Sequence, residues 1–247
     1  MCIKTEFIDI DERIDGLKQG ELICIASRPT VGKKIFTYNL VTNIAKRQIP
    51  ILIFSLDNSK KQTLKGIYDV IFAINRAGDN RVYSEERNAE DVNTSIVVKE
   101  NTYILDNILS IEIIEQNARL MKLQKNIGLI IIDYLQLIKT DTTIEDTIKR
   151  LKALAKELNV PVLILSQLSR ELESREDKKP TLTDFKKSSA IVDYADTIMF
   201  VYRDDYYNED SEKKSVVEVI TAKNKYGNIG TDELLDIKNR YVNISRD

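Results

Sequence analysis

The stretch LICIASRPTVGKK, at residues 22–34, decides how the rest of the chain is interpreted. It consists of an apolar strand, a short polar loop and a pair of lysines where a helix is expected to begin. A loop of this kind points several backbone N–H groups at one spot on a helix N-terminus, where the helix dipole favours anions and a lysine adds a positive charge. The stretch therefore predicts a loop that binds the phosphates of a nucleotide.

The loop fits the strict phosphate-loop pattern GxxxxGK[ST] only in part. Gly32 and Lys33 fit it, whereas Ser27 replaces the first glycine and Lys34 replaces the final serine or threonine. An ordinary strand-to-helix turn that happens to contain Gly-Lys is the alternative explanation. The residues predicted to form the nucleotide-binding loop are Arg28, Pro29, Thr30, Val31, Gly32, Lys33 and Lys34.

The composition limits the size of the fold and the chemistry. A chain of 247 residues suffices for one large α/β domain or two small ones. It contains no histidine, which excludes a histidine general base, a Ser-His-Asp triad and the usual zinc sites. Its two cysteines are too few for a disulfide framework. Hydrolytic chemistry in this chain would therefore depend on carboxylates, lysines or a bound metal.

The charge and the distribution of apolar residues limit location and partners. No stretch resembles a signal peptide, and none approaches the roughly 20 apolar residues of a membrane span. We therefore expect a cytoplasmic protein without a membrane partner. The net charge of −2 argues against a globally basic nucleic-acid-binding surface but is compatible with a local basic loop.

Short apolar strands alternate with amphipathic helices along most of the chain. The strands are predicted at residues 22–26, 51–55, 96–99, 129–132, 162–166, 197–202, 216–222 and 233–237. Such a pattern is typical of βαβ units in a mainly parallel, twisted sheet that is covered on both faces. Two segments interrupt it: residues 76–93 are a predicted surface excursion, and residues 167–193 are a charged stretch without regular structure, which is usually functional or mobile.

Three strand ends carry candidate chemistry. Lys33 follows the first strand of the pattern, Asp57 the second, and Asp133 the most apolar one. Ligands of open α/β sheets bind beyond the carboxyl ends of the strands, so we expect these side chains to converge on one crevice. An aspartate after such an apolar strand is the Walker B pattern, whose carboxylate holds Mg²⁺. The alternative for Asp133 is a carboxylate that caps the next segment.

Residues 16–231 resemble the C-terminal motor domain of the DnaB-like replicative helicases, which are hexameric ring ATPases of the RecA-like fold. The matching stretches include GLKQGELICIASRPTVGK, IFSLDNS, GLIIIDYLQLI, SQLSRELESREDKKP and AKNKYGNIGT, in the family's order and spacing. The resemblance implies a single domain over residues 1–247 with an α/β, RecA-like P-loop NTPase fold. Its sheet would be mainly parallel, with helices on both faces and antiparallel strands on the C-terminal side.

The resemblance also implies ligands and roles. The cofactors would be ATP and Mg²⁺, and the partners single-stranded DNA, further copies of the chain in a hexameric ring, and other replication proteins. Lys33 aligns with the lysine on the β and γ phosphates, Asp57 with a glutamate that orients the attacking water, and Asp133 with the Walker B aspartate that binds Mg²⁺. Gln167 falls where a polar sensor couples the γ phosphate to the DNA-binding loops.

Two further sets of positions follow from the resemblance. Lys223 and Lys225 fall where a lysine and an arginine finger reach into the ATP site of the neighbouring subunit. Lys186, Lys187 and Ser189 fall in the loop that lines the central channel and holds DNA phosphates. Six copies of one short basic loop would make a positive channel without a basic monomer. A solvated surface loop is the alternative for the two channel lysines.

The chain departs from the family at three chemical positions. The ammonium of Lys34 replaces a hydroxyl, has only donors and cannot ligate a metal, so we expect it to lie against the phosphates as a substitute charge or to point to solvent. Asp57 retracts its carboxylate by roughly one C–C bond length, about 1.5 Å, relative to glutamate, and a misplacement of about 1 Å can cost on the order of a hundredfold in rate. Lys225 lacks the bidentate fork of arginine.

These departures leave three hypotheses. The first is a DnaB-like motor that hydrolyses ATP between the subunits of a ring. The second is a non-catalytic relative that binds or regulates a replicative helicase ring, which the three departures and the expected absence of the family's N-terminal domain and linker helix favour. The third is a RecA-fold ATPase of the recombinase or circadian-clock type, which would form filaments on DNA in place of closed rings.

Overall fold

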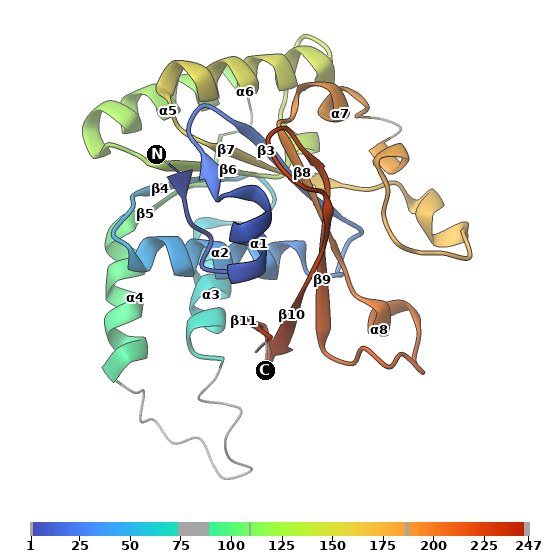
Figure 1. Ribbon diagram of the computed structural model, residues 1–247. Coiled ribbons are helices and arrows are strands. Elements are labelled where there is room, and N and C mark those ends of the chain that lie inside the picture. Colours follow the sequence, from blue (N-terminus) through green and yellow to red (C-terminus); the bar gives the residue numbers. More distant parts are fainter. Residues whose placement is uncertain (1, 74–88, 109, 186–187, 245–247) are drawn as a thin grey trace.

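The computed structural model describes residues 2–73, 89–108, 110–185 and 188–244, and a large sheet lies at its centre (Figure 1). The strands of that sheet are β3 (Leu22–Ser27), β4 (Ile51–Ser55), β5 (Thr102–Leu105), β6 (Leu129–Asp133), β7 (Val162–Gln167), β8 (Thr197–Tyr202), β9 (Val216–Asn224), β10 (Gly230–Ile237) and β11 (Arg240–Asn243). Their spatial order is β11-β10-β9-β8-β3-β7-β6-β4-β5. The strands from β8 to β5 pair in parallel, whereas β9, β10 and β11 join as antiparallel strands. The predicted mainly parallel sheet with antiparallel C-terminal strands is confirmed.

Helices cover both faces of the sheet. The helices are α1 (Ile8–Ile14), α2 (Lys33–Lys46), α3 (Lys60–Ile71), α4 (Ala89–Asn101), α5 (Ile111–Lys125), α6 (Ile144–Leu158), α7 (Ala190–Tyr194) and α8 (Asp204–Tyr207). Helices α2, α3 and α4 lie on one face, and α5 and α6 lie on the other (Figure 1). Alternate residues of β3 enter the two cores: Ile23 packs toward α2, and Cys24 packs toward α6. The parallel strands β3, β4 and β6 are almost wholly apolar because both of their faces are buried.

Local sequence signals account for where several helices begin and end. Helix α3 begins with a capping box between Ser59 and Gln62, and α6 begins with one between Thr143 and Asp146. Helix α6 ends at Asn159, which has the left-handed conformation that terminates helices. Within the described parts of the chain, no helix combines the length and the apolar character that a membrane crossing needs.

The predicted strand at residues 96–99 is wrong. These residues belong to α4, and the edge strand of this unit is β5, which follows directly. The run Ile96, Val97 and Val98 has the β-branched composition of a strand. Only Val98 is fully buried, however, where it packs into the core shared with α2 and α3, while Ile96 is 49% exposed. A helix places neighbouring residues on different faces, so α4 buries Val98 and leaves Ile96 exposed. This packing overrides the strand propensity of the β-branched residues.

The charged segment 167–193 contains more regular structure than predicted. Its described part includes two 3-10 helices, η3 (Arg170–Ser174) and η4 (Leu182–Phe185), and the helix α7. Ion pairs fasten it to the sheet and to itself, including Arg175 to Asp184 at 3.2 Å and Lys179 to Glu218 at 3.0 Å. Its charged residues therefore form specific contacts within the fold.

Candidate nucleotide-binding site

The predicted residues Lys33, Lys34, Asp57 and Asp133 lie at one edge of the sheet. Strands β3, β4 and β6 run parallel, so their carboxyl ends meet at the same edge. Lys33 and Lys34 follow β3, Asp57 follows β4, and Asp133 is the last residue of β6. The ammonium of Lys34 contacts the carboxylate of Asp57 and lies 3.7 Å from Oδ2 of Asp133. The convergence expected from the strand pattern is therefore present. The space that these four side chains border is called the crevice below.

The loop between β3 and α2 has the backbone of a tight turn. Gly32 caps α2 with a φ of 125°, and a Cβ at this position would lie 2.6 Å from the hydroxyl of Tyr241. Thr30 also has a positive φ, of 65°. Pro29 and Thr30 are exposed, whereas Val31 is buried. The loop thus requires glycine at its junction with the helix and presents its outer residues to solvent.

Arg28 has a structural role within this loop. Its guanidinium is 5% exposed and donates 2.7 Å hydrogen bonds to the backbone oxygen of Leu168 and to Glu173. These contacts fasten the loop to the segment that follows β7. The side chain of Arg28 is therefore already engaged, and its backbone N–H group is what remains for a ligand.

Lys33 is held against the end of β7. Its ammonium donates to the backbone oxygen of Ser166 at 2.9 Å and lies 5.5 Å from the ring centroid of Tyr134. Burial lowers the pKa of Lys33 to about 8, although the nearby charge of Asp133 partly opposes this shift. A buried ammonium with only a carbonyl oxygen as partner is suited to bind an anion, because the anion would restore its lost solvation.

Lys34 does not point to solvent. Its ammonium contacts the carboxylate of Asp57 and also lies near that of Asp133. Burial lowers the pKa of Lys34, but the charges of Asp133 and Asp57 outweigh burial and raise it overall. Lys34 is therefore a permanent cation at the position where the pattern calls for a hydroxyl.

Asp133 is an almost fully buried carboxylate, with 3% of its surface exposed. Within the described part of the chain, neither of its oxygens accepts a hydrogen bond. Burial raises the pKa of Asp133, while the ammonium groups of Lys34 and Lys33 lower it. Two buried oxygens without hydrogen bonds require a cation or a bound proton nearby, because a bare buried carboxylate is costly.

The prediction that Asp133 binds Mg²⁺ can be compared with this donor set. Its free oxygens suit a hard cation, which prefers carboxylate ligands. Lys34, however, places a donor-only group 3.7 Å from Oδ2 of Asp133. No group of three or more acidic or cysteine side chains that could hold a metal occurs among the residues described. The donor set therefore fits the ammonium of Lys34 and does not fit Mg²⁺ shared by Asp133 and Asp57.

Gln167 ends β7 beside a second glutamine, Gln136, which was not among the predicted site residues. Gln136, which lies in the 3-10 helix η2 (Leu135–Leu137), donates to the Oγ of Ser166 at 2.8 Å. It also accepts the backbone N–H of Gln167 at 3.3 Å. The backbone oxygen of Ser166 in turn accepts from Lys33, so Gln136 connects the strand of Asp133 to the strand of Gln167. The available signal was a single polar side chain within the apolar run LQLI, at residues 135–138.

Lys223 and Lys225 lie near the amino-terminal ends of β3 and β8, opposite to the strand ends that carry the loop. Lys223 donates to the backbone oxygen of Val192 at 2.7 Å and so holds the end of α7. Lys225 is half exposed, and its ammonium lies 3.7 Å from Oδ1 of Asp196. The backbone N–H of Asp196 bonds to the oxygen of Leu22, the first residue of β3. The six residues of β3, about 20 Å of extended chain, separate these lysines from the loop after that strand.

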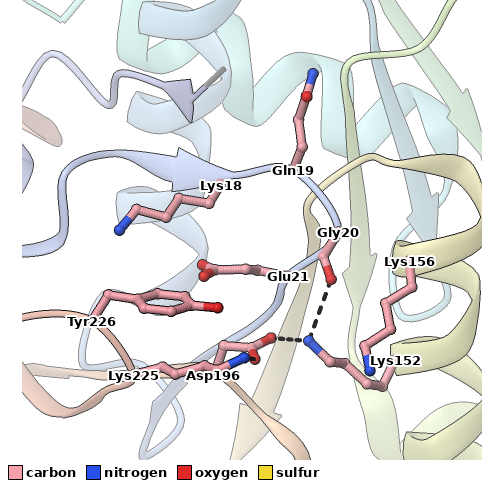
Figure 2. Close-up of a pocket in the computed structure, with 9 residues that line it drawn as sticks. All are labelled: Lys18, Gln19, Gly20, Glu21, Lys152, Lys156, Asp196, Lys225 and Tyr226. Atoms are coloured by element: carbon pink, nitrogen blue, oxygen red, sulfur yellow. Dashed lines mark hydrogen bonds and ion pairs between the residues drawn. The ribbon is translucent and has the colours of Figure 1, made fainter.

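A cleft of about 420 Å³ surrounds Lys225 (Figure 2). Asp196 is 6% exposed and accepts from both Lys152 and the backbone N–H of Leu22. Glu21 is 7% exposed and lines the same cleft. The ammonium of Lys225 also lies over the ring of Tyr226, at 4.8 Å from its centroid. These contacts hold Lys225 at the surface, away from its own chain's loop.

The predicted DNA-contacting residues are described only in part. Ser189 is exposed and immediately precedes α7. Lys186 and Lys187 lie outside the described residues. The roles of all three remain predictions.

The sheet order, the glycine-capped loop after β3 and the carboxylates after β4 and β6 define a P-loop nucleotide-binding domain of the RecA-like type. A family model described as the DnaB-like helicase C terminal domain matches residues 2–243. The chain belongs to this family, and the predicted resemblance is confirmed.

Known proteins resemble the chain over almost its whole length. It is 37% identical over 259 residues to the replicative DNA helicase DnaB of Geobacillus stearothermophilus, with 99% of this chain and 57% of that relative covered. It thus spans little more than half of that relative. One solved structure, an ATPase domain, matches with a TM-score of 0.84 and 32% identity over 99% of this chain and 92% of that one. A DnaB-like replicative helicase, solved in a study of its interactions with primase, matches with the same TM-score and identity over 99% of this chain and 62% of that one.

Proposed function

We propose that this chain is the ATP-binding motor domain of a replicative DNA helicase, with weakened catalytic positions. Residues 1–247 would form one RecA-like domain that acts on single-stranded DNA as part of a ring. The observation that carries the proposal is the convergence of Lys33, Asp57 and Asp133 at one edge of the sheet. A relative of the same fold is described as an ATPase domain, which supports ATP as the ligand.

Each residue of the crevice has a role in this proposal. The loop after β3 would bind the phosphates through its backbone N–H groups, and Lys33 would exchange its contact with Ser166 for a phosphate oxygen. Asp57 would orient the attacking water once a nucleotide draws Lys34 away from it. Gln136 and Gln167 would respond to loss of the γ phosphate and would transmit this change through β6 and β7 to the segment before α7.

Lys225 lies at the end of β3 that is opposite to the loop, and this position supports an oligomer. About 20 Å of β3 separates Lys225 from the loop of its own chain, so it cannot serve its own nucleotide. An exposed cation at that end can serve the nucleotide of a neighbouring copy. In the same ring, Lys186, Lys187 and Ser189 would face single-stranded DNA in the central channel. Contacts of this kind are head-to-tail, and they form a ring when the rotation between copies closes. We propose a closed, hexameric ring.

A non-catalytic helicase relative is the second candidate function, and one observation favours it. The carboxylate of Asp57, which should orient water, is bound by the ammonium of Lys34. A chain that keeps this contact with nucleotide bound would bind ATP without turning it over. Such a chain would act by joining or regulating a ring of active helicase subunits.

ATP affinity should depend on pH through Lys33. Phosphates bind its protonated form, so affinity should be full below the pKa of about 8 and should fall as the pH rises above it. We expect a decrease of about tenfold for each pH unit well above the pKa, because each such unit removes about nine-tenths of the remaining ammonium. Calorimetric titration with a non-hydrolysable ATP analogue measures this, with Lys33→Ala as a control that should show no such slope. An affinity that stays constant from below to well above the pKa would be inconsistent with this role of Lys33.

The proposed function is tested by assembly. Light scattering on the intact chain should show an increase from monomer to ring when ATP and a single-stranded oligonucleotide are added together. Lys225→Ala should bind ATP normally but assemble poorly, because its ammonium serves the neighbouring copy. A chain that stays strictly monomeric and binds no nucleotide under these conditions would refute the proposal.

A further inference from the structure

We propose that Lys34 is a built-in cation that replaces the divalent metal ion of this site, so that the chain binds a nucleoside triphosphate without Mg²⁺. This inference rests on the proposed nucleotide-binding function and concerns the same crevice. It starts from the contacts of one ammonium with two carboxylates.

The position of Lys34 leaves no room for a shared metal ion. Mg²⁺ requires near-octahedral oxygen ligands at about 2.0–2.1 Å. An ion at that distance from Oδ2 of Asp133, on the side of Asp57, would lie well within contact distance of the Lys34 ammonium, which is only 3.7 Å from that oxygen. The contact between Lys34 and Asp57 closes the same space from the other side. The ammonium and the metal ion therefore exclude each other.

The charges of the crevice explain why a cation is needed there. Asp133 is 3% exposed, and its oxygens lack hydrogen bonds within the described residues. Two neighbouring carboxylates near an incoming triphosphate would repel it unless a positive charge lay between them. The ammonium of Lys34 supplies that charge permanently. It is also close to the loop after β3, because Lys34 is the second residue of α2, the helix that follows this loop.

The donors of Lys34 suit a phosphate as well as the carboxylates. An ammonium has three N–H donors. When a triphosphate draws Lys34 away from Asp57, Asp133 can take one of them and the others are available to oxygens of the triphosphate. Lys33 approaches the same phosphates from the side of Ser166. Two ammonium groups and the loop N–H groups would thus hold a metal-free nucleotide.

Calorimetry on the intact chain tests this inference. A non-hydrolysable ATP analogue is titrated into the protein once in EDTA and once in millimolar Mg²⁺. The natural chain should bind at least as tightly in EDTA as in Mg²⁺. Lys34→Thr restores the hydroxyl of the pattern and should bind at least about tenfold more tightly in Mg²⁺ than in EDTA. Lys34→Met, which keeps the length but not the charge, should bind more weakly than the natural chain in EDTA.

The outcomes for the natural chain separate the two proposals. Binding that is clearly tighter in Mg²⁺ than in EDTA would overturn the built-in cation and leave nucleotide binding intact. Absence of binding in both buffers would overturn nucleotide binding and this inference with it. Both comparisons use the unaltered chain, so they hold even if a variant fails to fold.

Discussion

Replacing Lys33 with alanine is expected to weaken ATP binding on the order of a hundredfold. Hydrogen bonds to charged groups contribute about 1.5–3 kcal/mol, and 1.4 kcal/mol is about a factor of ten in the dissociation constant. Lys33 should lie at the upper end of that range, because its ammonium is buried and its only hydrogen-bond partner in the described structure is the backbone oxygen of Ser166. The measurement is calorimetric titration with a non-hydrolysable ATP analogue.

The fold should tolerate this change. Burial lowers the pKa of Lys33, which means that the folded protein disfavours its charged form. Lys33→Ala should therefore unfold at a temperature no lower than the natural chain does. Lys65→Ala is the matched control, because Lys65 is 75% exposed and pairs only with Asp69 in the described contacts. Equal ATP affinity for Lys33→Ala and Lys65→Ala would mean that the loop does not bind the phosphates.

Restoring the family's residues at three positions should raise ATP hydrolysis by at least about a hundredfold. The variant combines Lys34→Thr, Asp57→Glu and Lys225→Arg. The first change frees the acidic residue at position 57 from its ammonium partner. The second extends that carboxylate toward water, where about 1 Å of displacement can be worth on the order of a hundredfold in rate. The third supplies a planar, bidentate group to the neighbouring site.

Steady-state phosphate release, in Mg²⁺ and with single-stranded DNA present, measures this gain. The variant with Lys34→Thr and Asp57→Glu alone is the informative control, because it should show part of the gain. Adding the Lys225→Arg chain should raise its phosphate release further, since a mixed ring supplies an arginine to the site of the neighbouring copy. A natural chain that already releases phosphate as fast as the triple variant would show that Lys34 does not restrain Asp57.

Much of the fold could be predicted because its signals are local. Each parallel strand is a short apolar run, and each main helix carries apolar residues at helical spacing, so the sheet and its two helical layers follow from the pattern. Helix α4 was missed because Ile96, Val97 and Val98 look like a strand until α2 and α3 are present to bury Val98 alone. The short strand β11 was missed although its hairpin with β10 is local, because its buried residue, Tyr241, packs against Phe36, which is distant in the sequence.

The sequence predicted which residues of the candidate site lie close together, but it did not predict the contacts between their side chains. The rule that ligands bind at the carboxyl ends of parallel strands brought Lys33, Asp57 and Asp133 together. The partners of Lys34 depend on how far β4 and β6 extend past the loop, which no spacing in the sequence reveals. The link made by Gln136 depends likewise on the register of β6 against β7.

The central claim, that this chain is a nucleotide-driven motor on DNA, is tested most directly by phosphate release from ATP with and without single-stranded DNA. The natural chain is compared with Lys33→Ala, in Mg²⁺ and separately in EDTA. The proposed function predicts slow release that increases when DNA is added and disappears in Lys33→Ala, in at least one of the two buffers. Release that never exceeds that of Lys33→Ala, with DNA or without it, would contradict the motor and leave a nucleotide-binding partner of other helicase subunits.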